Sequence, residues 1–416
     1  MRPGLKFRGT FRLMLDPVFG PFIAGKFLST SGVWIHNVVA ALLAYQLTGS
    51  ALVVGLVSVA QFGPQIVLLP FSGVQADRGD KQKQLVIGRL VMALGSAIPA
   101  VWIAITGVDG LPGTWPVMLG AAILGLGIST GGPALNSVLP TFVRPAELGP
   151  AIALNNVPPT IARAAGPIVG TFVALTVGFD VAFAISVVGN LAYAYILHRL
   201  PIEGRSEATT TDRRPIRSGL RHLRGDKPLM LLLLGVVAVG VGSDPALTLA
   251  PSLSERLGRG TDLVGVFVSA FGIGAGVGFF LLTLLRWWIG EKRTATVGLC
   301  LAGAGLVGLV VDGPFLLVVV CLGVTGVGMT IGLTSLSTQI QDRVPAMFRG
   351  RIMALWGVAF MGSRPFAAAF DGAVADAFSP GAAFAMVAIF VFCCAWLCRP
   401  RRILPPSGGF LSDSTP

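Results

Sequence analysis

Four ionisable side chains lie inside long apolar runs of this sequence, where a charge is costly. They are Arg163, Asp244, Arg364 and Asp371. A charge at the centre of a bilayer costs roughly 2.5–3.5 kcal/mol on insertion scales, so such residues point first to function. Arg364 and Asp371 are about two helical turns apart and fall on one helix face. Carboxylates that exchange a proton beside a permanently charged arginine are suited to ion coupling.

Two of these residues, Asp244 and Asp371, are candidate protonation sites. Burial favours the protonated form of a carboxyl group and an arginine neighbour favours the ionised form, so a change of partner could move a proton. Two alternatives stay open. Asp371 could lie at an outer helix end in contact with water, and Arg364 could form a structural ion pair or bind backbone carbonyls. Lys26 lies close enough to one end of its run for its ammonium to reach the membrane surface.

The composition indicates that these residues are carried by membrane helices. The chain has 416 residues, of which 53% are hydrophobic and 12% charged, with a mean hydropathy of +0.78. Soluble domains carry about 25% charged residues, so lipid must be part of the solvent. About 20 apolar residues cross a bilayer, which gives about twelve spans. We expect them near 17–46, 51–73, 85–106, 114–142, 148–176, 180–199, 228–250, 262–285, 294–311, 314–340, 350–375 and 380–398.

A polar stretch divides the twelve runs into six and six. We therefore predict an all-α membrane protein with an N-terminal six-helix bundle (1–200), a cytoplasmic linker (201–227), a C-terminal six-helix bundle (228–398) and a cytoplasmic tail (399–416). A short internal repeat supports two similar halves, because Pro145–Ile152 and Pro345–Ile352 share Pro, Ala and Ile without gaps and both open the fifth run of their half. Parallel repeats of this kind occur in transporters.

Lys and Arg residues set the orientation. They crowd the loops on one side of the predicted membrane, whereas the opposite loops carry only Arg256 and Arg259. Cytoplasmic loops show this excess, so both termini and the linker are predicted to be cytoplasmic. The net charge of +12 is thus spread along one membrane face beside anionic lipid. This distribution argues against nucleic-acid binding.

A dense charged turn joins the second and third apolar runs. It runs from Gly73 to Lys83 and contains Ala76-Asp77-Arg78. The pattern G-x-x-A-D-R followed by basic residues resembles the loop 2–3 signature of the major facilitator superfamily of transporters. The resemblance departs from the superfamily where Gly and Arg often follow, because Asp80 and Lys81 stand there.

Further segments resemble the enterobactin-exporter-like, or transmembrane secretion effector, branch of that superfamily. They are Gly32–Asn37 with Tyr45–Ser50, Leu154–Gly170, and Arg349–Met353. The resemblance spans nearly the whole chain. It implies two pseudo-symmetric bundles in the cell membrane of a bacterium, and export of a siderophore or drug-like small molecule by alternating access with proton antiport. The arginine often found in the fourth helix of proton-coupled relatives is absent, since 114–142 carries no charge.

The resemblance also implies a gate. Asp77 would accept hydrogen bonds from the free N–H groups that open the run at 350–375, and would pair with Arg78. A solvated turn with topology charges is the alternative reading. The implied gating residues are Gly73, Asp77, Arg78 and Lys81, the antiporter-like Gly166-Pro167-x-x-Gly170, and Arg349 and Arg351. Thr171 stands where a second Gly would complete the antiporter pattern, so generic helix packing is the alternative there.

The first and fourth helices of each half line the central path in this fold, and the corresponding runs are polar here. The predicted cavity residues are Trp34, His36, Asn37, Asn136 and Thr334. His36 could instead titrate near neutral pH or bond to a neighbouring helix. We expect no enzyme activity, no cofactor and no metal, a monomer, and a small molecule, the proton and lipid as partners. Two other functions stay open, an uptake facilitator or symporter and a non-transporting receptor or assembly factor.

Overall fold

The computed structural model describes residues 10–78, 80–202, 223 and 225–400, and within these ranges the chain is helical without strands. A short helix, α1 (Thr10–Met14), precedes six long ones in the first half. These are α2 (Phe19–Thr48), α3 (Ala51–Arg78), α4 (Lys81–Thr106), α5 (Trp115–Val138), α6 (Leu148–Thr176) and α7 (Phe179–Arg199). The all-α fold predicted from the sequence is confirmed.

The second half begins with a broken helix and continues with five long ones. Its elements are α9 (Lys227–Ser243), α10 (Pro245–Thr248), α11 (Ala250–Arg256), α12 (Val264–Ile289), α13 (Glu291–Gly308), α14 (Phe315–Arg343), α15 (Ala346–Ala377) and α16 (Pro380–Leu397). The helix is interrupted within the predicted run at 228–250, although 227–248 as a whole is long and apolar enough to cross a membrane. Pro245 cannot donate to the helix ladder and its ring clashes with the preceding turn, so α9 ends at Ser243.

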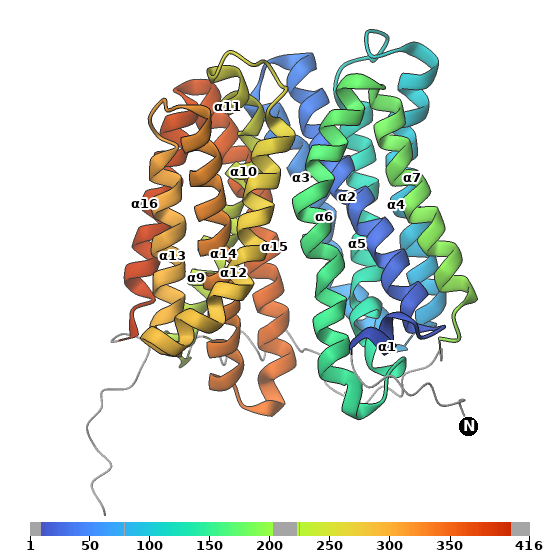
Figure 1. Cartoon of the computed structure of the whole chain (residues 1–416), viewed down its shortest axis with the longest axis vertical. Helices are drawn as coiled ribbons and strands as arrows, with labels where there is room; N and C mark the ends of the chain where they lie inside the picture. Colours follow the sequence, from blue (N-terminus) through green and yellow to red (C-terminus); the bar gives the residue numbers. More distant parts are fainter. Residues whose placement is uncertain (1–9, 79, 203–222, 224, 401–416) are drawn as a thin grey trace, which may run out of the picture.

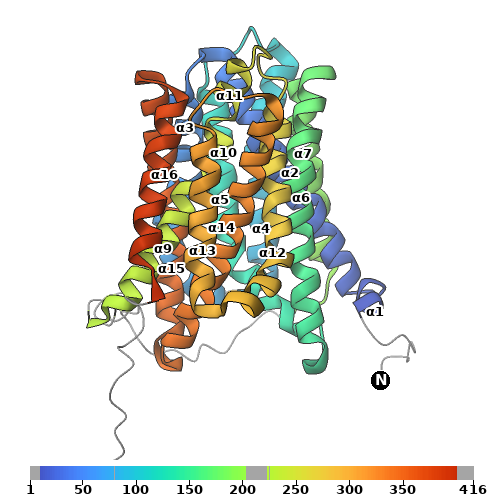
Figure 2. The same ribbon diagram turned by 60° about the vertical axis from the view of Figure 1, so that its left-hand side comes forward.

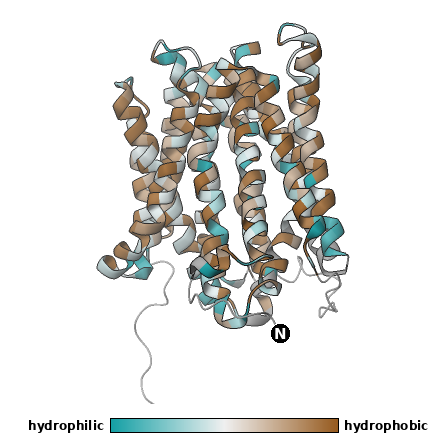
Figure 3. Cartoon of the chain, turned by 45° about the vertical axis from the view of Figure 1, so that its right-hand side comes forward, coloured by the Kyte–Doolittle hydropathy of each residue, from teal (hydrophilic) through white to brown (hydrophobic). Residues whose placement is uncertain are grey.

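Nine helices in the described part of the chain are long and apolar enough to cross a membrane. The remaining long helices are α3, of which 51–66 is a shorter apolar stretch, α6 and α13. Figure 3 shows hydrophobic residues along most of the helix length, with hydrophilic ones gathered mainly toward the helix ends. The predicted repeat marks helix starts, because Pro145 opens a 3₁₀ turn that leads into α6 and Pro345 precedes α15. The predicted linker lies mostly outside the described residues.

The helices form two bundles that stand side by side, α2–α7 in one and α9–α16 in the other (Figure 1). We call the end where α1 and the last turn of α16 lie the terminal end, and the opposite end the distal end. The most extensive packing between the bundles pairs α3 with α15 and α6 with α12. Figure 1 and Figure 2 show the distal ends of the helices gathered closely, whereas the terminal ends of α6 and α15 diverge.

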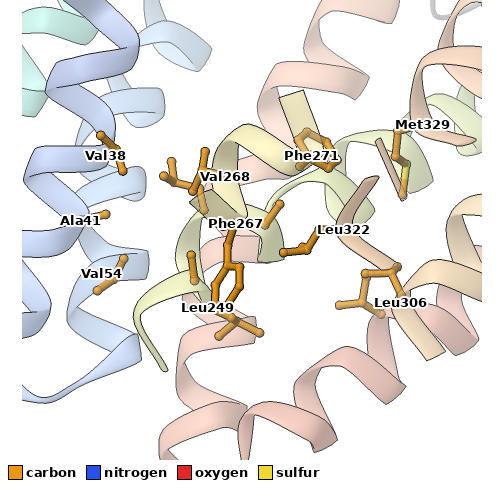
Figure 4. Packing of buried hydrophobic residues seen from close by; sticks show 14 of the residues in the cluster. Val38, Ala41, Val54, Leu249, Phe267, Val268, Phe271, Leu306, Leu322 and Met329 are labelled. Atoms are coloured by element: carbon orange, nitrogen blue, oxygen red, sulfur yellow. The ribbon is translucent and has the colours of Figure 1, made fainter. Parts of the chain in front are cut away.

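Glycines allow the two bundles to approach within backbone contact. A Cβ added at Gly55 in α3 would lie 2.2 Å from the carbonyl oxygen of Ala368 in α15. A Cβ at Gly272 in α12 would lie 2.3 Å from the carbonyl oxygen of Arg163 in α6. Nearer the distal end, Val38 lies opposite Val268 in Figure 4, where apolar side chains of both bundles pack. The distal half of the interface is therefore closed by backbone and apolar contact.

Candidate functional site

A cavity of about 240 Å³ lies between the bundles. Trp34 from α2 and Arg163 from α6 line it on one side, and α9, α10, α12, α14 and α15 line it on the other. Its walls include Phe271, Phe360 and Arg364. The cavity is thus apolar and aromatic with two guanidinium groups, the composition of a small-molecule site with a few convergent polar groups.

An ion pair between α9 and α15 lies beside this cavity. The Arg364 Nε atom is 3.7 Å from Oδ1 of Asp244, and the carboxylate is fully buried. Thr248 donates a hydrogen bond of 2.6 Å to Oδ2 of the same residue. Asp244 lies between the end of α9 and the start of α10, at the helix break that Pro245 causes. Arg364 also stacks on the Phe62 ring of the other bundle, 4.4 Å from its centroid.

Asp371 lies on the same helix as Arg364 and is fully buried. Neither of its carboxylate oxygens has a hydrogen-bond partner among the described residues. A buried carboxyl group without partners is more stable protonated than ionised. The reading of Asp371 as a water-contacting helix end is therefore wrong for this conformation.

Arg163 has an unusual environment for a cation. Its guanidinium carbon lies 5.7 Å from the Trp34 ring centroid. The side chain makes no hydrogen bond or ion pair with the described residues, and its Nε is buried without a partner. The predicted ion-coupling residues therefore fall into two groups. Asp244, Arg364 and Asp371 lie together on the C-terminal bundle, and Arg163 lies across the cavity on α6.

At the distal end, a carboxylate from one bundle caps a helix of the other. Asp376, near the end of α15, accepts hydrogen bonds from the backbone N–H groups of Ala51 and Leu52, at 2.8 and 3.1 Å, and from the Ser50 hydroxyl. These N–H groups open α3, where a helix favours negative charge. We call these four residues the distal latch. The sequence motifs gave no indication of it.

Two side-chain bonds reinforce this closure. The Tyr45 hydroxyl donates to Glu255, and Nε2 of Gln46 donates to the Thr261 hydroxyl at 2.9 Å. Each bond joins α2 to the α11 region of the other bundle. With the latch, they tie the distal ends of the bundles together.

The predicted gate at the terminal end lies partly outside the described residues. Gly73, Asp77 and Arg78 belong to the last turns of α3. The structure does not describe the side chains of Asp77, Arg78 and Arg349. Lys81 is the first residue of α4. The Arg351 guanidinium lies 5.5 Å from the Phe348 ring centroid. The role of these residues as a gate stays a prediction.

The antiporter-like segment of α6 packs against both bundles. A Cβ at Gly166 would meet Trp34 Cβ at 2.8 Å, and one at Gly170 would meet Val38 at 2.8 Å, so α6 lies directly on α2. The Pro167 carbonyl oxygen would lie 2.6 Å from a Cβ on Gly265 of α12. The three residues thus form a thin helix surface between α2 and the opposite bundle.

His36 differs from its expected place in the cavity. It is fully buried inside the N-terminal bundle, where Nδ1 lies 3.0 Å from the Ser96 hydroxyl and the ring meets Phe183 edge-on. Ser96 lies 2.9 Å from the Ser186 hydroxyl. Trp34 and His36 are two positions apart, about 200° around a helix, so only one of them can face the cavity. The interhelical alternative for His36 is the one that the structure supports.

Two other predicted cavity residues, Asn37 and Thr334, are not among the described residues that line it. Asn37 has a buried Oδ1 without a described partner. The Asn136 side chain is not described. Thr334 is half-buried in α14, one position past Leu333, which does line the cavity.

Arg89 in α4 is a buried cation that the sequence analysis missed. It donates a hydrogen bond of 3.0 Å to the Ser29 hydroxyl and lies 4.9 Å from the Tyr193 ring centroid. Lys26 does not extend to the surface as expected. It is 9% exposed and donates to the backbone and side-chain oxygens of Asn155 at 2.9 and 2.6 Å. The signal for Arg89 in the sequence was a single arginine inside the apolar run at 85–106.

Comparison with known proteins places nearly the whole chain in one protein family. Residues 9–406 match the family described as transmembrane secretion effector. The macrolide efflux protein A of Streptococcus pyogenes is 24% identical over 359 residues, covering 84% of this chain and 87% of that protein. The protein of the same name in Enterococcus faecalis is 25% identical, covering 74% and 96%. The uncharacterized MFS-type transporter YfiS of Bacillus subtilis is 26% identical, covering 79% and 80%.

Solved structures share the fold at low identity. The peptide transporter POT in complex with sulfate aligns with a TM-score of 0.74 at 12% identity, covering 91% of this chain and 93% of that one. A bacterial homologue of the iron transporter ferroportin, in an inward-facing state, aligns with a TM-score of 0.71 at 13% identity, covering 90% and 98%. These similarities show the architecture and nothing about cargo.

Proposed function

Because the chain belongs to the transmembrane secretion effector family of the major facilitator superfamily, we propose that it exports a small molecule across the cytoplasmic membrane by alternating access. The observation that carries the proposal is the cavity between the two bundles, lined by Arg163 and Arg364 beside the buried Asp244. Efflux is also the activity named for two of the relatives. A siderophore or a drug-like compound is the cargo class proposed from the sequence.

The conformation is inward-facing if the terminal end is cytoplasmic, as the Lys and Arg distribution predicts. The distal latch then closes the outer side, and the bundles diverge on the inner side (Figure 1). The reverse state requires the latch to open and a second contact to form at the terminal end. Asp77 at the end of α3 is the residue proposed for that contact, and Gly73, Arg78, Lys81, Arg349 and Arg351 are the other residues proposed for the gate.

Proton antiport is the proposed energy source. Asp244 has an incomplete partner set, since its Oδ1 meets Arg364 only at ion-pair distance and makes no hydrogen bond among the described residues. Protonation of Asp244 would remove the charge that pairs with Arg364 and weaken the contact between the α9–α10 break and α15. Asp371, the second buried carboxyl group of the cluster, could pass or store the proton. A proton taken from outside would thus exchange for cargo taken from inside.

Inside-out membrane vesicles test both export and coupling. Vesicles containing the protein should accumulate a fluorescent cargo when their interior is acidified, and an uncoupler should abolish the accumulation. Asp244→Asn should remove accumulation against a gradient while cargo still equilibrates down its gradient. Asp262→Asn, at an exposed loop position, is the matched control and should transport normally. Unchanged accumulation by Asp244→Asn would refute coupling at this residue.

Uptake and a non-transporting role predict different results. A symporter or facilitator would accumulate the same cargo in right-side-out vesicles or intact cells. A receptor or assembly factor would move no cargo in either orientation. Export predicts lower cargo content in cells that express the protein than in cells without it, over a panel of siderophores, antibiotics and dyes.

A further inference from the structure

We propose that the cargo carries an oxyanion, such as a carboxylate or phosphate, attached to an aromatic body, and that Arg163 and Arg364 bind the oxyanion in the central cavity. This inference rests on the proposed transport function and narrows it to a substrate class. It follows from unused hydrogen-bond donors, from the charge of the cavity and from its aromatic walls.

The two arginines hold hydrogen-bond donors that the protein does not use. A guanidinium group has five N–H donors. Among the described residues neither Arg163 nor Arg364 makes a hydrogen bond; Arg364 has the 3.7 Å ion pair with Asp244 and stacks on the Phe62 ring. Buried polar groups in proteins are nearly always paired, so donors facing a cavity call for an acceptor there. Planar guanidinium groups match carboxylate and phosphate oxygens in paired geometry.

The cavity has a positive charge balance. Its lining residues include two arginines and no carboxylate. Asp244 lies outside the lining and offsets part of the Arg364 charge. Asp371, fully buried without a described partner, is more stable neutral. Arg163 therefore remains uncompensated. A cationic cargo would meet like charge at short range in a partly desolvated site, where repulsion is screened less than in water.

The remaining walls suit a flat apolar group. Trp34, Phe271 and Phe360 line the cavity together with Met329 and Met361. Aromatic and thioether side chains adapt to ring systems. Stacking of the Trp34 ring against Arg163 brings the apolar wall and the cation to the same point. Ligand sites usually enclose about 300–1,000 Å³, so a cavity of about 240 Å³ holds the anionic end and adjoining ring of a larger molecule.

Two dyes with one xanthene framework provide a direct binding test. Fluorescein is anionic and rhodamine 123 is cationic. With the purified full-length protein in lipid nanodiscs, fluorescence anisotropy should show tighter binding of fluorescein. Arg163→Gln should weaken fluorescein binding by about ten-fold or more, since charge-assisted hydrogen bonds are lost. Arg163→Lys keeps the charge but lacks the planar guanidinium group, so its fluorescein affinity should lie between those of the unaltered protein and Arg163→Gln.

Arg199→Gln is the matched control, because Arg199 also stacks on an aromatic ring, that of Tyr195, but lies at the end of α7 away from the cavity. Its fluorescein affinity should equal that of the unaltered protein. Gel filtration and thermal unfolding of each variant establish that the fold is retained. Competition by benzoate and by phenyl phosphate then distinguishes a carboxylate from a phosphate as the preferred oxyanion.

Several results would overturn the inference. They are tighter binding of rhodamine 123 than of fluorescein, no binding of either dye or competitor, or unchanged fluorescein affinity in a folded Arg163→Gln protein. The inside-out vesicle assay separates this outcome from failure of the proposed function. Pumping of rhodamine 123 but not fluorescein would leave export intact and refute the anionic class. Arg163-dependent binding of fluorescein without pumping of any dye would refute export and leave the binding site.

Discussion

Replacement of Gly55 by alanine should shift the protein away from the distally closed conformation. The added Cβ would lie 2.2 Å from the Ala368 carbonyl oxygen and 2.7 Å from its carbon. Both atoms are backbone, so no side chain can rotate aside, and α3 and α15 must separate by about 1 Å to restore van der Waals contact. Overpacking of this kind costs about 1–3 kcal/mol. The ratio of distally closed to distally open molecules should fall by about 5-fold to 150-fold.

A control on the same helix isolates the contact. Gly63 has no atom within 4 Å of a built Cβ. Gly63→Ala brings the same gain in helix propensity, about 1 kcal/mol, without a clash. A difference between the two variants therefore reports the α3–α15 interface and not helix stability.

Chemical cross-linking at the distal end measures the shift. Cysteines at Gln46 and Thr261, whose Nε2 and Oγ1 atoms are 2.9 Å apart, should be joined by a short bifunctional thiol reagent in a background without the five native cysteines. Gly55→Ala should slow the reaction and Gly63→Ala should not. Equal cross-linking rates for Gly55→Ala and its parent would show that the bundles do not close through this backbone contact.

The other predictions use the same assays. Asp376→Ala removes all three hydrogen bonds of the distal latch. Because the Asp376 side chain is exposed, the expected cost is about 1 kcal/mol after screening, so cross-linking should slow about five-fold. The control Asp109→Ala, at an exposed loop position, should leave the cross-linking rate unchanged. Ser96→Ala leaves His36 and Ser186 without their shared partner and should destabilise the fold by about 1–3 kcal/mol. A melting temperature equal to that of the parent would contradict this estimate.

The extent of sequence-based prediction followed from the range of each interaction. Apolar runs located the helices because a membrane helix needs a long apolar segment, which can be read directly from the sequence. The run predicted at 148–176, for example, matches α6. Helix spacing placed Arg364 and Asp371 on one face, whereas the ion pair of Arg364 is with Asp244 on another helix. Proline acts locally, so the helix break at Pro245 was readable in principle, but hydropathy does not show it because the apolar span continues through Pro245.

The rest of the site depends on rotation and on contacts distant in sequence. Polarity alone could not decide whether Trp34 or His36 faces the cavity, because the rotation of α2 about its axis is set by packing against α4, α6 and α7. The surroundings of Arg89 likewise depend on residues of other helices, Ser29 and Tyr193. The hydrogen bonds of Asp376 join residues 324 to 326 positions apart, and they exist only because α3 and α15 are neighbours.

The antiparallel contact of α3 and α15 has a mechanical consequence. Asp376 ends one rod and binds the beginning of the other. If Asp77 does the same at the opposite end, the two helices rock against each other, and the contact at one end forms only when the contact at the other end is broken. Neither rod needs to bend for this. The permeability barrier would then pass from one membrane surface to the other, and a leak would require both tips to be raised at once.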